Sequence, residues 1–355
     1  MGMPNPSQPP ASSLRAGRDY PPCYADLQSW FPDDEACLDY LEWLRWPNGF
    51  VCPRCETRGR WRMGDGRFWC ESCRCRVSVT TGTLFHGTRT PLTVWFAAAW
   101  SMTSAKNGVS AKTLHRLLGF GSYQTAWSML HRFRVAMVRP ARDRLAGEVE
   151  VNEMFIGGLK PGKRGRGAEG KALVAVAVEL LSPKGFGRCR LSVIPNTQSS
   201  TLRAFLLDGI QPGSVIVTDG LSSYPTAMGD NYLHKPHVVA GASKPAHVSL
   251  PGVHRVASLL KRWLLGTHQG AVEADHLQAY LNEFAFRFNR RRAEFRGLLF
   301  RCLLEQAIHV EPVTYRSLVI NPSPKLTKPH PPIKHGTHPP TISGITPRPW
   351  RDHNQ

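Results

Sequence analysis

Hydrophobic and polar residues alternate along this chain with two different spacings, and the change of spacing divides the chain into two parts. In the first part, apolar residues recur every three or four positions, which is typical of amphipathic helices. One such run lies within residues 24–46 behind a Pro-Asp-Asp start, and another covers residues 91–138 with breaks at Gly108 and at 119–121. The pattern predicts a short first helix and then two or three more.

From residue 147 the pattern changes to short apolar runs of the kind that form strands. Three such runs are followed by a helical segment, a fourth strand and two further helical segments. In chain order these are EVEVNEMFIGG, KALVAVAVELL, GRCRLSVIP, STLRAFLLDGI, SVIVTDG, HRVASLLKRWLLGT and DHLQAYLNEFAFRFNRRR. Three strands, a helix, a strand and then helices predict a mixed α/β sheet.

Both ends of the chain have the composition of disordered segments. The first residues are rich in proline and serine, and residues 321–355 are basic and rich in proline and histidine. No apolar run reaches the roughly 18 residues that a membrane-spanning helix needs, and the first residues lack the apolar stretch of a secretion signal. We therefore expect a soluble, cytoplasmic protein with a disordered leader and a disordered tail.

The net charge narrows the choice of partner. The 355 residues include 45 Lys and Arg against 26 Asp and Glu, which gives +19. So many dispersed cations favour a polyanion as partner, with nucleic acid ahead of an anionic membrane surface. The length predicts two or three domains, and 41% hydrophobic residues exclude a wholly disordered chain.

Five of the nine cysteines lie between positions 52 and 75. Cys52 and Cys55 form one C-x-x-C pair, and Cys70 and Cys73 form a second. Tetrahedral Zn²⁺ takes four thiolates at roughly 2.3 Å and then has no open position for a substrate, so the spacing predicts a zinc ribbon with a structural ion. Cys75 in place of Cys73 would also complete the site, so the fourth ligand stays open. Arginines interleaved with aromatic residues favour a nucleic-acid surface over a protein-docking one.

The glycine breaks divide residues 109–137 into two helices joined by a tight turn, with Ser110 and Ser122 as N-caps. This is a candidate helix-turn-helix, whose second helix would present polar side chains to DNA. Those side chains are Gln124, Thr125, Ser128, His131, Arg132 and Arg134. Any small helical hairpin has this pattern, so it does not by itself decide the function.

Candidate catalytic residues come from the second part. Asp219 follows an apolar strand, where its carboxylate emerges at an edge of the sheet, and Asn152 lies on the first strand. His254 begins a helix on which Lys261, seven residues later, shares its face. Taken alone, Asp219 is typical of a turn and His254 of a helix cap. Only the combination indicates a site.

These motifs, in this order, resemble those of bacterial insertion-sequence transposases with an RNase H-like (retroviral-integrase-like) catalytic domain of the DDE type. The resemblance runs from about residue 24 to about residue 318 and rests on VEVNEMFIGG, VTDG, HRVASLLKRWLLGTHQG and LQAYLNEFAFRFNRRR after the zinc ribbon. With the ends, it implies five parts. They are a leader (1–23), a short helix plus zinc ribbon (24–85), a helical DNA-binding segment (86–146), a catalytic domain (147–320) and a tail (321–355).

The resemblance also implies roles. Asn152, Asp219, His254 and Lys261 match the catalytic positions, with Asp219 and His254 as ligands of a catalytic Mg²⁺ or Mn²⁺ and Lys261 on a phosphate near the scissile bond. We expect DNA contacts from Arg132, Arg134, Arg262, Arg290 and Arg291. The implied partners are transposon ends, target DNA and further copies of the chain, without a membrane.

One position departs from the family pattern, which has Asp where this chain has Asn152. An amide oxygen is neutral and Mg²⁺ prefers anionic oxygen, so we expect metal affinity and rate to fall. On the strand, Glu150 faces the same side as Asn152 but about 7 Å away, and Glu153 faces the other side. The alternative functions are an inactive DNA-binding relic or regulator, a zinc-ribbon protein-interaction module and, more distantly, a structure-specific nuclease.

Overall fold

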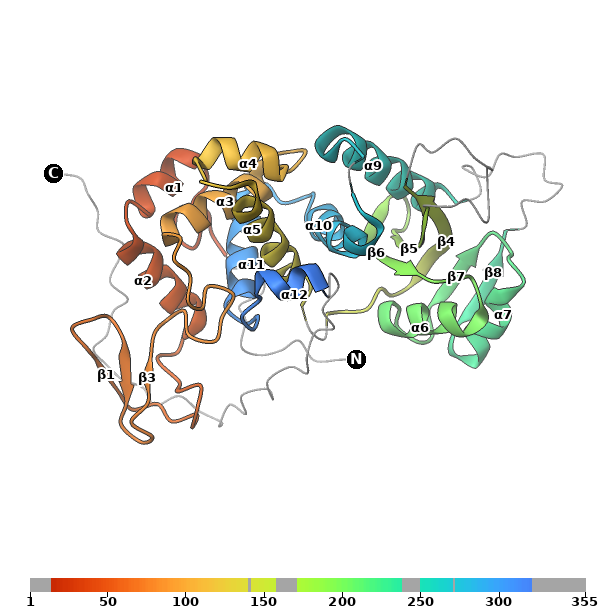
Figure 1. Cartoon of the computed structure of the whole chain (residues 1–355). Coiled ribbons are helices and arrows are strands. Elements are labelled where there is room, and N and C mark those ends of the chain that lie inside the picture. Colours follow the sequence, from red (N-terminus) through yellow and green to blue (C-terminus); the bar gives the residue numbers. More distant parts are fainter. Residues whose placement is uncertain (1–13, 140–141, 158–170, 238–249, 271, 321–355) are drawn as a thin grey trace. The chain divides into compact units, whose positions relative to one another are not determined.

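The computed structural model describes residues 14–139, 142–157, 171–237, 250–270 and 272–320, and Figure 1 labels its elements. The predicted tail at 321–355 and the first 13 residues of the predicted leader lie outside these ranges. No helix within the described ranges is long and apolar enough to cross a membrane.

Two helices precede the cysteine cluster at residues 52–75. They are α1 (Tyr24–Trp30) and α2 (Asp34–Arg45). Asp33 caps α2, because its carboxylate accepts a hydrogen bond from Ala36 N at 2.9 Å. Tyr20 is buried, and Tyr40 Oη donates to Asp19 O at 2.8 Å. The predicted disordered leader through residue 23 is therefore wrong for residues 14–23, which pack against the first helices.

The helical part continues with α3 (Leu92–Ser104), α4 (Ala111–Leu118) and α5 (Tyr123–Ala136). Ser110 and Ser122 accept hydrogen bonds from Thr113 N and Thr125 N, so both predicted N-caps are confirmed. Before these helices in the chain lies a small antiparallel sheet, and Cys70 is the last residue of its second strand. Its strands are β1 (Arg60–Arg62), β2 (Phe68–Cys70) and β3 (Arg76–Val77), in that order.

A five-stranded mixed sheet forms the second part, with the order β6-β5-β4-β7-β8. β4, β5 and β6 are antiparallel, whereas β7 and β8 add parallel to β4 on its other side. The strands are β4 (Glu148–Ile156), β5 (Ala172–Leu180), β6 (Phe186–Ile194), β7 (Val215–Thr218) and β8 (Leu233–Pro236). The predicted mixed sheet is confirmed. β8 was not predicted, because this short and mostly exposed edge strand carries little apolar alternation.

Helices cover both faces of this sheet (Figure 1). Strand residues of alternating parity supply the two apolar faces, because successive side chains point to opposite sides. Val174, Val176 and Val178 of β5 pack under α9 and α10, while Ala175 and Ala177 face α6. The remaining elements are α6 (Ser199–Gly209), α7 (Ser223–Met228), the 3₁₀ turn η2 (Gly229–Asn231), α9 (Pro251–His268), the 3₁₀ turn η3 (Ala274–His276), α10 (Leu277–Asn289), α11 (Gly297–Ala307) and α12 (Tyr315–Ile320).

The chain returns to the helical part after α10. Phe300 of α11 packs against Phe96 and Trp100 of α3, with ring centroids 5.6 and 5.7 Å apart. Leu299, Leu303 and Leu304 share the same apolar core as α2, α3 and α5. The prediction of one catalytic domain over residues 147–320 is therefore wrong for its last segment, since α11 completes the core of the N-terminal helices.

Helix α10 also closes the free edge of β6. Asn289 accepts a hydrogen bond from Cys189 N at 2.7 Å and donates one to Cys189 O at 3.1 Å. Further along β6, the Gln278 side chain accepts a hydrogen bond from Val193 N and donates one to Leu191 O. Side-chain amides thus satisfy edge groups that would otherwise be open to another strand. These bonds fix α10 and the arginines that follow it against β6.

A buried ion pair joins α5 to α10. Arg134 Nε lies 2.9 Å from Glu283 Oε2, and the two side chains are 2% and 0% exposed. The Arg134 guanidinium also lies 4.0 Å from the Tyr280 ring centroid, and Arg287 lies 3.7 Å from the other Glu283 oxygen. Each charge loses its hydration here, so each depends on the other for compensation.

Replacing Glu283 with Gln is expected to lower the free energy of unfolding by about 3 kcal/mol, because Arg134 would remain buried without a counter-charge. Asp39→Asn provides the matched control, since Asp39 and its partner Arg62 are both about half exposed. That pair should contribute no more than about 1 kcal/mol. Urea unfolding of both variants measures the difference, and equal losses would show that the buried pair has no special weight.

Three histidines lie beside this ion pair in a cluster of aromatic rings. His131 of α5 packs on Trp127 at 4.1 Å between centroids and on His276 at 5.2 Å, and His268 packs on Tyr280 at 4.7 Å. Burial, with the charge of Arg134, lowers the pKa of His131 far below its usual value and that of His268 to about 3. Both rings are therefore neutral in the folded chain at neutral pH.

The stability of the chain should fall as the pH drops below about 6.5, because the unfolded state then binds protons that the folded state excludes. The loss continues down towards pH 3, where His268 protonates in the folded chain. His131→Phe should remove about 2 kcal/mol of the loss between pH 7 and pH 5. Urea unfolding at the two pH values tests this, and an unchanged pH dependence in the variant would contradict it.

Candidate functional site

The four predicted zinc ligands lie in two turns with the same backbone geometry. In the first turn Glu56 N donates to Cys52 O, and in the second Arg74 N donates to Cys70 O. Glu56 and Arg74 both have a left-handed backbone, with φ of 60° and 58°. Cys73 therefore occupies the position in the second turn that Cys55 occupies in the first.

The sulfur atoms of these turns converge on one point. Cys52, Cys55, Cys70 and Cys73 are the only group of three or more His, Cys, Asp or Glu side chains in the described ranges whose ligand atoms could share one ion, and these atoms all lie within 4.8 Å of one another. Cys55 and Cys70 Sγ are 3.4 Å apart, and Cys52 and Cys73 Sγ are 3.6 Å apart. Thiolates of a tetrahedral zinc site stand about 3.8 Å apart, so the donor set fits zinc.

Cys75 lies next to this cluster, 3.2 Å from Cys73 Sγ and 3.4 Å from Cys52 Sγ. Its place corresponds to that of Thr57 in the first turn, whose hydroxyl lies 3.3 Å from Cys55 Sγ. Both residues also accept a backbone hydrogen bond from the first cysteine of their turn. The repeat of the two turns thus gives Cys75 the position of a neighbour of the ligands.

Asn152 lies on β4, and Asp219 follows β7, which is the neighbour of β4 in the sheet. β4 and β7 are parallel, and Glu150 pairs with Val217 in their ladder. Asn152 lies two residues beyond Glu150 within β4, and Asp219 lies two residues beyond Val217, directly after β7 ends at Thr218. Within β4, Asn152 faces the same side of the sheet as Glu150, because the pleat has a period of two. Asn152 Oδ1 accepts from Glu153 N at 2.8 Å, and Asp219 Oδ1 accepts from Leu221 N at 3.1 Å.

Glu150 fixes the start of α9 on the same face. Its Oε2 accepts a hydrogen bond from Val253 N at 2.8 Å, and Gly252 N contributes a second. A side chain on Gly252 would bring its Cβ to 2.8 Å from the Glu150 carboxylate, so the close approach requires glycine. Burial nevertheless raises the pKa of Glu150. Sequence reasoning weighed Glu150 as a metal ligand, whereas the structure uses its carboxylate to hold the helix.

Helix α9 carries the other two candidate residues. His254 lies in its first turn, directly after Val253, and is half-buried. Lys261 and Arg262 lie two turns further along and are exposed. Figure 1 shows α9 lying over β4 and β5. The Glu150 contact therefore joins the first turn of α9, with His254, to the strand that carries Asn152.

Glu153 is confirmed to face the other side of the sheet. Tyr224 of α7 donates a hydrogen bond from its hydroxyl to Glu153, on the side covered by α6 and α7. Burial, with the charges of Glu153 and Asp219, raises the pKa of Tyr224. Glu153 is therefore engaged away from Asn152 and does not supply the missing carboxylate.

The residues predicted to hold the catalytic cation include a single carboxylate, that of Asp219. The other two are Asn152, with a neutral amide oxygen, and His254, with an imidazole. Mg²⁺ and Mn²⁺ prefer carboxylate and other oxygen ligands, and an imidazole adds no negative charge. One further carboxylate at position 152 would bring the site closer to that preference.

Several of the predicted DNA contacts are wrong. Arg134, His131 and Ser128 are buried, so this face of α5 cannot reach DNA. Arg132 is half-buried and donates to Val313 O at 2.8 Å. Helix propensity and polarity do not reveal that α10 and the segment before α12 cover this face.

The arginines after α10 are half-buried as well. Arg291 donates to Gly187 O and Phe186 O, and its guanidinium lies 4.0 Å from the Phe288 ring centroid. Arg290 donates to Phe286 O and lies 4.0 Å from that ring centroid. Arg291 thus anchors the end of α10 to β6, whereas Arg262 remains a free surface candidate.

Comparison with known proteins matches both parts of the chain. The model of a transposase zinc-ribbon domain matches residues 32–76, and that of an ISXO2-like transposase domain matches residues 144–289. An uncharacterized protein in transposable element ISH50 of Halobacterium salinarum is 29% identical over 276 aligned residues. The match covers 72% of this chain and 91% of that protein.

Among solved structures, the simian T-cell lymphotropic virus intasome in complex with PP2A regulatory subunit B56 gamma contains a chain that is 15% identical. The match covers 67% of this chain and 85% of that chain, with a TM-score of 0.25. A score this low does not establish a common fold.

Proposed function

We propose that this chain, which belongs to the insertion-sequence transposases with an N-terminal zinc ribbon and an ISXO2-like transposase domain, binds transposon ends and cuts and joins DNA phosphodiester bonds there. The observation that supports the proposal is the parallel pairing of β4 and β7, in which Glu150 pairs with Val217. Extended by two residues, this register would set Asn152 level with Asp219, which lies 67 positions away in the sequence. The basic charge of +19 supports DNA as substrate.

The sheet supports an RNase H-like catalytic domain. Three antiparallel strands in chain order, followed by two strands that add parallel on the other side of the first, are the arrangement expected of that fold. α11 belongs to the helical core, so we place the catalytic unit within about residues 147–289 and assign α11 to the helical part. The ligands proposed for the structural zinc are Cys52, Cys55, Cys70 and Cys73.

We assign the catalytic roles to Asn152, Asp219, His254 and Lys261. Asp219, the Asn152 amide oxygen and His254 would hold Mg²⁺ or Mn²⁺, and Lys261, exposed on the same helix, would contact the phosphate beside the scissile bond. A divalent cation bound there would help to activate the attacking water or 3′-hydroxyl and to stabilise the leaving oxygen. With one carboxylate in this set, we infer weak activity for the chain as it stands.

DNA transposition needs two ends held together, so the active form would be a dimer or a larger assembly on DNA. The phosphate contacts would position the duplex without reading its sequence. Of the predicted DNA-contacting arginines, Arg262 is the one whose side chain is exposed in the structure.

The second candidate function is a DNA-binding protein without activity, a relic or a regulator of active copies, and Asn152 is the observation that favours it. The two are separated by incubating the full chain with a labelled duplex that carries the element's ends, with Mg²⁺ or Mn²⁺. Binding with strand cutting supports the transposase, and binding without cutting supports the relic. Absence of binding to the ends would contradict both.

A further inference from the structure

Away from the candidate catalytic face, five arginines line one pocket of about 250 Å³. The lining of this pocket includes one carboxylate, that of Asp143. The pocket lies where the end of α5, the segment at 142–143, β6, α10 and α11 meet. We call it the arginine pocket, and its charged lining residues are Arg139, Arg142, Asp143, Arg188, Arg190 and Arg290.

The arginine pocket is separate from the site at Asp219. Arg190 pairs in register with Ala177, whose side chain lies on the face of α6, whereas Asn152 lies on the face of α9. β6 stands three strands away from β7 in the sheet, which corresponds to about 14 Å at the usual strand spacing. An occupant of the arginine pocket would therefore be held apart from the reacting bond.

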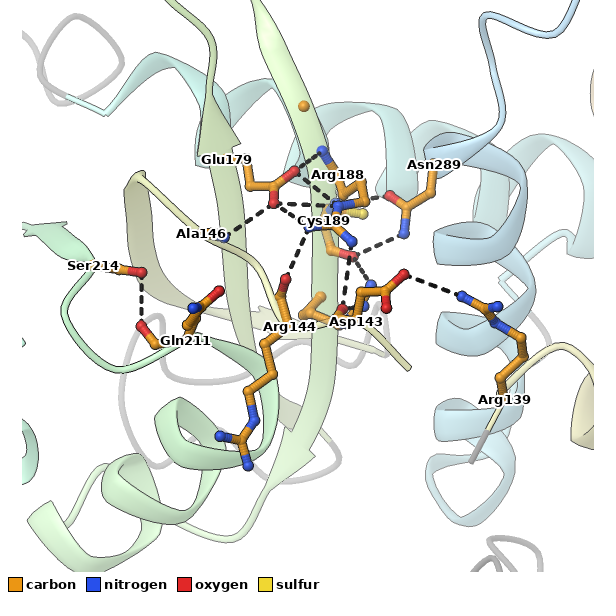
Figure 2. Close-up of polar contacts among 12 residues, drawn as sticks. Arg139, Asp143, Arg144, Ala146, Glu179, Arg188, Cys189, Gln211, Ser214 and Asn289 are labelled. Carbon is orange, nitrogen blue, oxygen red and sulfur yellow. Dashed lines mark hydrogen bonds and ion pairs between the residues drawn. The ribbon is translucent and has the colours of Figure 1, made fainter. Parts of the chain in front are cut away.

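Backbone carbonyls and the carboxylate of Glu179 hold the innermost guanidinium groups in place. Arg188 forms an ion pair with Glu179 at 2.7 Å and donates to Arg144 O at 2.8 Å, as Figure 2 shows. Arg190 donates to Asp143 O and to Cys189 O. Asn289, in the lining, is fixed by its two bonds to Cys189. The inner part of the pocket is thus built before any ligand arrives.

The positive charge of this pocket is not fully compensated. Within the described residues, Arg190 and Arg290 have no carboxylate at ion-pair distance, and the buried Nε of Arg190 has no hydrogen-bond acceptor. Burial, together with Arg142 and Arg188, lowers the pKa of Arg190 to about 10, and Arg139 adds to the lowering at Arg290. These guanidinium groups therefore repel one another, and an anion between them would relieve the repulsion.

The outer arginines are placed to bind rather than to support the fold. Arg139 is 45% exposed and meets Asp143 at 3.4 Å, and Arg142 meets Asp208 at 3.1 Å. Both carboxylates are more than 70% exposed, so these ion pairs are weak and can be exchanged for another anion. In Figure 2 the Arg139 guanidinium points towards the Asp143 carboxylate.

We propose that the arginine pocket binds a phosphate oxyanion, and that this phosphate belongs to the backbone of the bound DNA. The planar guanidinium group of arginine presents paired N–H donors that match the oxygens of a phosphate, and several such groups line this pocket. The volume of about 250 Å³ is several times the roughly 30 Å³ of a water molecule, so one phosphodiester fits. The DNA assignment rests on the proposed function, whereas the oxyanion assignment does not.

The test removes the two outer charges, with Arg139→Gln and Arg142→Gln combined in the full chain. A matched control removes two exposed charges elsewhere, Lys184→Gln and Arg316→Gln. Affinity for a labelled duplex is measured against salt concentration, both for the element's end and for an unrelated duplex. The pocket variant should lose between about fivefold and thirtyfold in affinity at about 0.15 M salt, equally for both duplexes, and its salt slope should become shallower by about 1 to 2.

A titration with inorganic phosphate, with chloride at equal ionic strength as the reference, distinguishes free phosphate from a DNA backbone phosphate as the bound anion. The melting temperature of the unaltered chain should rise with phosphate, and the rise should be smaller in the pocket variant than in the control. If the pocket variant loses this rise but binds DNA as tightly as the control does, the pocket holds free phosphate and the DNA assignment is wrong. If both variants behave alike in both assays, the pocket is no anion site.

Failure of the proposed function gives a different result. An unaltered chain that binds no DNA at all would contradict the transposase proposal, while the phosphate titration would still decide whether the pocket takes an oxyanion. Conversely, if the pocket variant binds and cuts DNA as well as the control variant does, only the proposed role of the arginine pocket is contradicted.

Discussion

Asn152→Asp should raise Mg²⁺-dependent cutting of transposon ends by at least about a hundredfold. Even changes outside the direct ligands of a metal site alter affinity or activity by about 10- to 100-fold, and this change adds a carboxylate beside Asp219. The backbone should tolerate it, because an Asp oxygen can accept the hydrogen bond from Glu153 N that Asn152 now accepts. The rate of strand cutting with a labelled end measures the effect.

The control keeps the number of carboxylates at one. The double variant Asn152→Asp, Asp219→Asn has its one carboxylate at position 152 instead of position 219. The gain in cutting rate should therefore disappear, while DNA binding stays the same. A second control, Asn196→Asp, adds the same charge near the start of α6. If Asn152→Asp cuts no faster than the chain as it stands, the amide is not what limits activity.

Removal of zinc should unfold the ribbon. Its sheet has strands of three, three and two residues, which is too small to be stable alone. A structural zinc ion contributes roughly 10 kcal/mol or more to the folding of such a module, and here Cys70 and Cys52 are fully buried at its centre. The aromatic contact of Phe50 with Phe68, at 5.4 Å between ring centroids, adds too little to replace the ion.

Cys73→Ser and Cys75→Ser form a matched pair for this prediction. We expect Cys73→Ser to lose the bound zinc and Cys75→Ser to retain one ion per chain, because Cys73 repeats the position of Cys55. Zinc content after gel filtration and the near-ultraviolet circular dichroism of the ribbon aromatics measure the outcome. Loss of zinc from Cys75→Ser alone would reverse the assignment of the fourth ligand.

Local features of the chain could be predicted from residues close together in the sequence. Ser110 and Ser122 cap helices because their hydroxyls reach backbone groups three residues on. The two C-x-x-C turns bring thiolates together through short loops. The first four strands of the large sheet follow from short apolar runs. β8 could not be predicted in this way, because an exposed edge strand needs little apolar character. Its backbone hydrogen bonds with β7 are what make it a strand.

Burial of polar residues could not be predicted in this way. Arg134 looks like a solvent-facing helix residue, and only its ion pair with Glu283, 149 residues away, makes it part of the core. From the sequence, Glu150 could be a substitute metal ligand. In the folded chain Gly252 and Val253 pack against its carboxylate, which accepts a hydrogen bond from Val253 N and so holds the start of α9. Partners so distant in the sequence leave no signal in the local pattern.

The sequence by itself determined the zinc-binding cysteines, the strand and helix types and the identity of the residues at positions 152, 219 and 254. These depend on spacing, periodicity and side-chain chemistry within a few residues. Tertiary structure alone decided that α11 completes the N-terminal core, that Arg134 is buried and that five arginines line one pocket. The reason is physical: burial and electrostatic environment are set by which distant elements pack together, and packing depends on the whole chain.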